Sequence, residues 1–294
     1  MQTVGIFFYT AGIPRMSQSR DPRSYQIAIL VALVVYGLVG LNGWHLEIQP
    51  VMAFIILAVA LAAQLAGTRL AGLPRFDPRS ALISSLSLCL LLRTDSLVLA
   101  AITAVVTIAS KFLLRIDDRH MFNPTNFGLA VMMALGAGVW VSPGQWGTGA
   151  FFAFLLAGCG GLVIHRAARS DVTYAFIGFY SAIVFARAAF LGDPLAIPLH
   201  HLQNGAFLLF AFFMISDPKT TPDSRAGRIV FALMVALGAG FVHFVLFQPN
   251  GLLWSLVLSA PITPLLNRLL PGGRYQWQTP STTPTETFSE RSFA

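Results

Sequence analysis

The sequence is poor in charged residues. Only 11% of its 294 residues are Asp, Glu, Lys or Arg, whereas soluble domains carry about 25%. Hydrophobic residues make up 55% of the chain, and its mean hydropathy is +0.70. This composition excludes an ordinary soluble domain, because most of the surface must be solvated by lipid. It predicts an integral membrane protein, all-α and polytopic.

Cysteine is also scarce. Cys89 and Cys159 both lie in hydrophobic runs, and two cysteines are too few for a disulfide framework or a cysteine-based metal site. No P-loop, dinucleotide-binding glycine motif or nucleophile elbow occurs in the sequence. A bis-histidine haem needs two imidazoles at equal depth on facing helices. Four histidines are expected on the outer side, His45, His200, His201 and His243, so such a pair is conceivable there. The absence of any recurring helical spacing of histidines argues against it. Packing is the ordinary role left for both cysteines.

Long hydrophobic runs dominate what is present. We count ten: residues 26–44, 50–67, 80–92, 96–114, 125–141, 149–165, 172–191, 202–215, 228–247 and 250–270. Most are long enough for a hydrocarbon core about 30 Å thick, which a helix of about 20 residues crosses. The third and eighth runs are short. The sequence therefore predicts ten transmembrane segments, two of which do not cross fully.

The basic residues indicate the orientation. If the N-terminus is cytoplasmic, 17 of the 19 Lys and Arg residues fall on the cytoplasmic side, and only Arg93 and Arg187 fall outside. Such a bias is typical of membrane proteins. Both termini are therefore expected in the cytoplasm, with residues 1–25 as a leading segment and the Ser/Thr/Pro-rich residues 277–294 as a disordered tail.

Two half-chains of five segments resemble each other. The short third run ends near Asp95 and the short eighth near Asp217. The fifth and tenth runs open at Asn123-Pro124 and Pro249-Asn250. An odd number of crossings inverts the second half, so residues 26–141 and 149–270 are predicted to be two inverted five-helix repeats. Short segments in matching positions indicate a binding site near the membrane midplane.

The first candidate residues are hydroxyl side chains of the short third run. Ser84, Ser85 and Ser87 lie in "SALISSLSLCLLL". Small hydroxyl residues let helices approach closely and can satisfy interrupted backbone. A packed helix interface is the plain interpretation, and a site lining is the alternative.

A second set of candidates lies in two loops expected at the cytoplasmic face. The loop "SDPKTTPDSR" carries Asp217, Lys219, Thr220 and Thr221, and the stretch "KFLLRIDDRHMFNPTN" carries Lys111, Arg115, Asn123 and Pro124. Asn-Pro is an ordinary helix start, because Asn caps the first turn and Pro lacks an N–H that this turn leaves unpaired. Cationic side chains beside helix N-termini also suit an anionic or phosphorylated ligand.

Three stretches together resemble a known family. "RHMFNPTNFGLAV", "FMISDPKTTP" and "SALISSLSLCLLLR" are similar to the RnfD and NqrB membrane subunits of the Rnf and sodium-pumping NADH:quinone oxidoreductase complexes. The similarity runs from about residue 26 to residue 270. It implies a ten-helix inverted repeat, flavin-dependent electron transfer, redox partner subunits, and movement of Na⁺ or H⁺ across a bacterial inner membrane.

One departure from the family pattern matters. The resemblance implies FMN attached to the Thr of a Ser-Gly-Ala-Thr motif after the fifth segment, but here that loop reads "SPGQWGTG", and the motif is absent from the chain. Thr148 and Thr173 lack its context. We therefore expect a non-covalent flavin, FMN or riboflavin. The alternative is a flavin-free channel or transporter for a small solute or ion.

Overall fold

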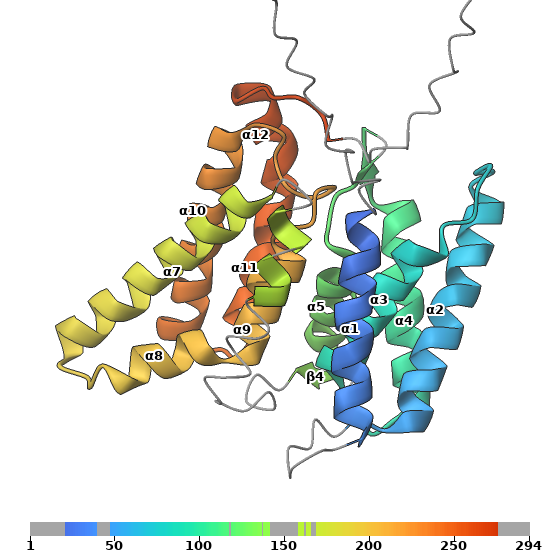
Figure 1. Ribbon diagram of the computed structural model, residues 1–294, viewed down its shortest axis with the longest axis horizontal. Coiled ribbons are helices and arrows are strands. Elements are labelled where there is room, and N and C mark those ends of the chain that lie inside the picture. The colour runs from blue at the N-terminus through green and yellow to red at the C-terminus, as the bar shows by residue number, and fades with distance from the viewer. Residues whose placement is uncertain are drawn as a thin grey trace, which may run out of the picture. The chain divides into compact units, whose positions relative to one another are not determined.

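The computed structural model describes residues 21–39, 48–117, 119–136, 138–141, 158–161, 163–165 and 169–275. Helices make up most of this part of the chain, and turn residues start many of them. Asp77 and Ser96 accept hydrogen bonds from backbone N–H groups of the helices that follow them. The helices of the first half are α1 (Pro22–Val39), α2 (Pro50–Leu70), α3 (Pro78–Leu91), α4 (Leu97–Leu113) and α5 (Pro124–Ala134) (Figure 1).

The second half contains one interrupted helix and one composite helix. Its elements are α7 (Ser170–Leu191), α8 (Ala196–Gln203), α9 (Gly205–Leu209), the π-helical η3 (Phe210–Met214), α10 (Arg225–Phe244), α11 (Gly251–Ser259), the 3₁₀ turn η4 (Ala260–Ile262) and α12 (Thr263–Leu269). Two short antiparallel pairs complete the described fold: β1 (Leu92–Arg93) with β4 (Trp140–Val141), and β2 (Arg115–Ile116) with β3 (Arg119–His120).

Some predicted segments differ from the helices. The fifth was expected to reach residue 141, but α5 ends at Ala134 because Gly136 takes a left-handed conformation, with φ of 62°. The eighth was expected at 202–215. Instead α8 begins at Ala196, and Asn204 interrupts it in extended conformation and caps α9 with its side chain. The sixth, 149–165, lies largely outside the described residues.

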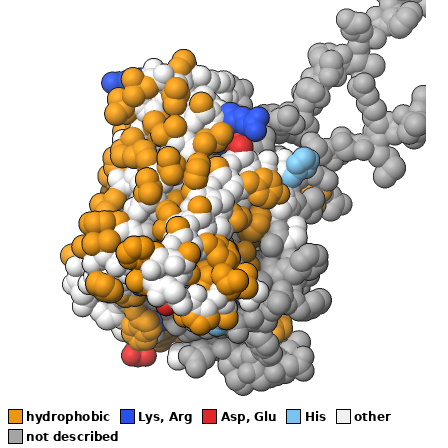
Figure 2. Space-filling model, turned by 90° about the vertical axis from the view of Figure 1, so that its left-hand side faces the viewer, with side chains coloured by type: hydrophobic (Ala, Val, Ile, Leu, Met, Phe, Trp, Pro, Cys, Tyr) orange, Lys and Arg blue, Asp and Glu red, His pale blue; other side chains and the backbone are white. Residues whose placement is uncertain are grey.

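Four described stretches have the length and hydropathy to cross a membrane: Pro50–Leu70, Ser170–Leu191, Arg225–Phe244 and Gly251–Leu269. Hydrophobic side chains cover most of the face seen in Figure 2, and charged side chains appear only towards its upper and lower ends. Phe190 and Leu237 are among the exposed hydrophobic residues. These helices and this surface indicate that the chain is a membrane protein. The ten crossings and the inverted repeat stay predictions.

The two halves pack by similar pairings. In the first, α2 and α5 contact α4; in the second, α7 and α11 contact α10, and α5 meets α11 between them. Glycine allows close approach at both inner pairings. A Cβ atom at Gly128 would lie 1.9 Å from Thr107 Oγ1, and one at Gly238 would lie 2.4 Å from Ser255 Oγ. This arrangement places α5 and α11 at the junction of the halves.

The second Pro-marked helix start differs from the first. Pro124 occupies the first turn of α5, as expected. Pro249 instead precedes the cap of α11, which is Asn250 in left-handed conformation and without a side-chain capping bond. The two entrances are therefore not equivalent in backbone structure.

Candidate functional site

Two loops meet at the end of the bundle where α4 ends and α10 begins. Arg119, in the β2–β3 hairpin, donates to both carboxylate oxygens of Asp223, at 2.8 and 3.2 Å. The adjacent His120 places its Nε2 atom 3.5 Å from Asp217 Oδ2. Because both carboxylates belong to the loop between η3 and α10, the structure brings the two loops of the sequence analysis together.

Asp217 organises its own loop. Its carboxylate accepts from the Lys219 backbone N–H at 3.0 Å, and its carbonyl accepts from the hydroxyls of Thr220 and Thr221. Burial raises the pKa of this carboxyl. The hydrogen bond and charge of His120, together with the N–H and ammonium of Lys219, lower the pKa by more, so that it lies below its usual value. The Ser-Asp-Pro-x-Thr-x-Pro motif thus has a clear structural role.

A cavity of about 370 Å³ opens between these loops and α12, and we call it the loop cavity. The residues lining it are mostly polar: Asp117, Arg119, His120, Lys219, Thr220, Asp223, Thr263, Asn267 and Arg274, with Ile116, Met121 and Pro264. Asp223 engages Arg119, and the Asp117 carbonyl accepts from Arg274. Among the described residues, no hydrogen-bond or ion-pair partner is present for the Lys219 ammonium. That ammonium is the cation most available to a ligand.

Asn123 lies outside the loop cavity and contacts both halves of the molecule. Its Oδ1 accepts from the Asn126 N–H at 3.1 Å, and its Nδ2 donates to the Met214 carbonyl at 3.4 Å. The first bond caps α5, which Pro124 begins. The second reaches the last residue of η3, in the eighth predicted segment. Asn123 is therefore a helix cap that also satisfies backbone of the opposite half.

The three serines of α3 do not reach the loop cavity. Ser84 and Ser85 donate to carbonyls of the preceding turn of their own helix, at 3.1 and 2.9 Å. The Ser84 carbonyl accepts from the Thr125 hydroxyl of α5 at 3.2 Å. Ser87 is half-buried. These contacts fit the packed-interface interpretation of this helix.

Lys111 and Arg115 are also separate from the loop cavity. The buried Lys111 ammonium donates to the Ser80 carbonyl at 2.7 Å and to the Ser80 hydroxyl at 3.1 Å, which ties the end of α4 to the start of α3. Arg115 is exposed on β2. Of the predicted residues, only Lys219 and Thr220 line the loop cavity.

Several lining residues were not among the predicted site residues. Arg119 and Asp223 lie 104 positions apart, so only the fold brings them together. Asn267 lies within the last predicted hydrophobic segment, 250–270. Its Oδ1 accepts from the Asp223 N–H at 2.8 Å. The one sequence signal for Asn267 as a site residue was its polar side chain next to Arg268, near the end of a hydrophobic segment.

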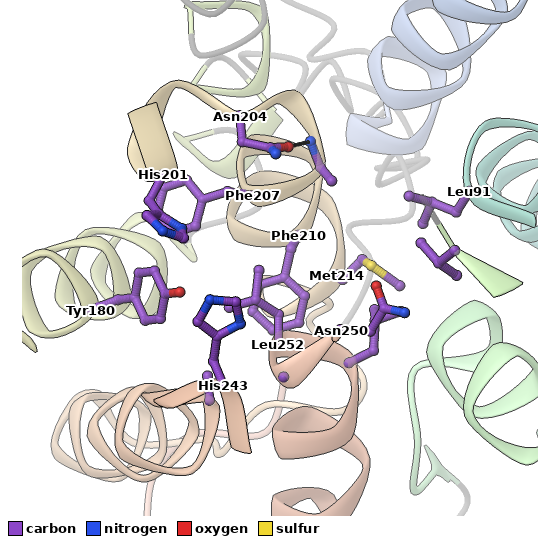
Figure 3. Close-up of a pocket in the computed structure, with 15 residues that line it drawn as sticks. Leu91, Tyr180, His201, Asn204, Phe207, Phe210, Met214, His243, Asn250 and Leu252 are labelled. Atoms are coloured by element: carbon purple, nitrogen blue, oxygen red, sulfur yellow. Dashed lines mark hydrogen bonds between the residues drawn. The ribbon is translucent and has the colours of Figure 1, made fainter. Parts of the chain in front are cut away.

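A second cavity, of about 100 Å³, lies where α7, α8 and α10 meet, and we call it the aromatic cavity. Tyr180, Phe207 and Phe210 supply aromatic rings, His201 and His243 imidazoles, and Asn204 and Asn250 amides; Leu91 and Val141 complete the side towards the first half. Figure 3 shows the Tyr180 hydroxyl directed towards His243, with His201 nearby and Asn250 on the far side of Phe210. From the sequence, His201 and His243 stand out only as histidines expected on the outer side, and Asn250 only as part of the second Pro-marked helix start.

Comparison with known proteins identifies the family. The model of the NQR2, RnfD, RnfE family matches residues 24–275. The chain belongs to this family. The match spans the whole predicted membrane part and both loops of the loop cavity.

Curated proteins match part of this chain at modest identity. A protein from Psychromonas ingrahamii is 33% identical over 127 residues, 42% of this chain and 34% of its own length. One from Citrobacter koseri is 30% identical over 106 residues, 36% of this chain and 30% of its own length. Both carry the name of the D subunit of an ion-translocating oxidoreductase complex. The matched part of the chain spans about a third of the length of these relatives.

Proposed function

We propose that this chain is a membrane-embedded electron-transfer subunit of RnfD type, in a bacterial inner-membrane complex that moves Na⁺ or H⁺. The observation that carries the proposal is the family match over residues 24–275. The names of the curated relatives support it, since they describe subunits of an ion-translocating oxidoreductase complex. The expected partners are the bilayer and the other redox subunits of that complex.

We further propose that the loop cavity holds a non-covalent flavin. Cavities that take ligands of this size measure about 300–1,000 Å³. The loop cavity, at about 370 Å³, falls in that range, whereas the aromatic cavity, at about 100 Å³, is too small for a three-ring group. The polar lining of the loop cavity also suits the carbonyl edge of a flavin or the phosphate of FMN.

Two lining residues have donors available for such a ligand. The Lys219 ammonium would stabilise negative charge on the ring or on a phosphate. The Asn267 amide oxygen accepts from the Asp223 N–H, whereas its amide nitrogen has no partner among the described residues. Arg119 is less available, since Asp223 binds it through two hydrogen bonds. A bound flavin would supply the electron transfer, and these residues would position it.

The flavin content of the purified chain tests this proposal. We expect the full chain, purified in detergent, to release flavin into the supernatant on acid precipitation. Lys219→Gln should lower the flavin content several-fold, because it removes the available cation without changing the loop backbone. Arg115→Gln is the matched control, since Arg115 is on the neighbouring hairpin and outside the cavity. Equal flavin content in the two variants would contradict the loop cavity as the site.

Fluorescence that stays with the denatured chain would instead indicate covalent attachment. Thr173 is a poor attachment point, because its hydroxyl is fully buried and donates to the Ala211 carbonyl at 2.9 Å. Thr148 lies outside the described residues. A covalent flavin would therefore direct attention to Thr148.

A flavin-free channel or transporter is the second candidate. The observation that favours it is polar structure within the bundle: the helix interrupted at Asn204, and the buried Thr107 Oγ1 and Asn126 Oδ1, which have no partner in the described residues. Interrupted helices and polar groups at this depth are typical of transport sites. Purified chain without flavin that still conducts a small solute or ion in proteoliposomes would favour this function over the first.

A further inference from the structure

The aromatic cavity collects polar groups that have no hydrogen-bond partner in the described residues. They are the Tyr180 hydroxyl, the imidazoles of His201 and His243, the Asn204 amide nitrogen and the Asn250 amide oxygen. Tyr180 is buried, whereas His201, Asn204, His243 and Asn250 are half-buried around the same cavity. Polar groups inside folded proteins are nearly always paired, so we expect the Tyr180 hydroxyl, and the half-buried groups that face it, to be satisfied by something other than this chain.

The lining indicates an uncharged ligand. The described residues that line this cavity include no Lys, Arg, Asp or Glu, and the charge that acts on its two imidazoles from outside the lining is the cation of Arg187. An ion that enters a largely apolar site without a counter-charge loses several kcal/mol of hydration energy. Neutral imidazoles, amides and a phenol instead offer both donors and acceptors to a neutral polar molecule.

The walls indicate a flat ring. Tyr180 stacks on Phe207 with their centroids 5.4 Å apart, and His201 meets His243 edge to face, also at 5.4 Å. Phe210 forms the floor between the Tyr180–His243 side and Asn250 (Figure 3). Aromatic faces and edges bind another ring by offset stacking or T-shaped contacts. A volume of about 100 Å³ limits the ligand to one ring.

We propose that the aromatic cavity is a binding site for a neutral, single-ring aromatic molecule that carries a hydrogen-bonding substituent. The ring lies against Phe207 and Phe210, and its polar substituent reaches Tyr180 and the imidazoles. This site is separate from the loop cavity and does not depend on whether a flavin binds there.

Phenol and cyclohexanol test the proposal as a matched pair. Both carry one hydroxyl on a six-membered ring, but only phenol is flat and aromatic. With the full detergent-purified chain, we expect saturable phenol binding in ligand-observed NMR, measured against micelles alone. Cyclohexanol should show only the non-saturable partition that micelles also show. Equal binding of the two compounds, or no saturable binding of phenol, would overturn the proposal.

Two tyrosine variants locate the binding. Tyr180→Phe removes only the hydroxyl from the cavity and should weaken phenol binding at least fivefold. Tyr174→Phe makes the same change on an exposed residue of the same helix and should leave binding unchanged. Flavin content should be equal in both, since neither residue lines the loop cavity. Displacement of phenol by methylammonium would show a cation site and overturn the inference.

Discussion

At the scale of single residues, Asn123 makes the most informative pair of contacts. Asn123→Ala removes both the cap of α5 and the bond to Met214. A lost cap costs roughly 1 kcal/mol, and loss of the second bond adds to that cost, although the Met214 carbonyl keeps the bond from the Asp217 N–H at 3.4 Å. Asn123→Ser keeps a capping hydroxyl but is too short to reach Met214. Thermal unfolding in detergent should rank wild type above Asn123→Ser and Asn123→Ser above Asn123→Ala.

Equal stability of Asn123→Ser and wild type would show that the bond to Met214 contributes nothing. The sequence predicts that Asn126→Ala is milder than Asn123→Ala, because Asn126 lacks the Pro context. The contacts of Asn126 argue against that ranking. Asn126 is fully buried, and its Nδ2 donates to the Leu253 carbonyl of α11 at 3.1 Å, which joins the two halves directly.

Residue-scale prediction from sequence worked where contacts are local. The Asn-Pro helix start at Asn123 could be recognised because the capping bond spans three positions. The pairing of Arg119 with Asp223 could not, since it depends on how α4 and α10 are placed in space. Lys111 looked like a ligand residue from its charge, yet it binds backbone of α3 31 positions earlier in the chain.

At the scale of elements, the loop between η3 and α10 should make stability depend on pH. The pKa of Asp217 is lowered in the folded protein. A carboxyl of this kind stabilises the fold above its unfolded pKa, about 3.9, and this contribution is lost as pH falls through the lower, folded value. We expect the melting temperature of the wild type to fall more steeply below about pH 4 than that of Asp217→Asn.

Asp95→Asn is the control for this pH series. Asp95 occupies the matching position after the third predicted segment, but its side chain is exposed. Its removal should leave the acid limb of the stability curve as in wild type. Parallel curves for Asp217→Asn and wild type would show that the His120 contact does not stabilise the loop.

Element lengths were predictable only in part. The short α3 followed from its hydrophobic run, because Pro78 and Arg93 bound it closely. The early end of α5 did not, because residues 135–141 are as hydrophobic as a helix, whereas Gly136 and Gly138 take left-handed conformations after Ala134. The break at Asn204 was also missed, since Gln203 and Asn204 were included near the start of the hydrophobic run 202–215 and the polar His200 and His201 before it were left outside.

At the scale of the whole molecule, the charge bias predicts that both termini are cytoplasmic. Seventeen of 19 basic residues fall on one side under the ten-segment scheme. Reporter fusions at Ser17 and at Thr279 should both report the cytoplasm. An external signal from one of them would require an odd number of crossings and would remove the inverted repeat.

The membrane class and the family followed from composition and three short motifs, because both depend on long stretches of the chain. The cavities did not follow, since each collects residues from segments far apart in sequence. Sequence motifs led to Lys219 and Thr220 in the loop cavity, but in the aromatic cavity only to Asn250, through the second Pro-marked entrance.

The π-helical turn Phe210–Met214 sets the direction of the residues beyond it. Its closing bond runs from the Ile215 N–H to the Phe210 carbonyl, so this turn holds one residue more than an α-helical turn. If this turn closed as a regular α-helix without losing a residue, everything beyond it would rotate by about 100°. Met214 would turn away from Asn123, and Asp217 from His120. The π-helical closure of this turn therefore keeps Met214 and Asp217 facing their partners.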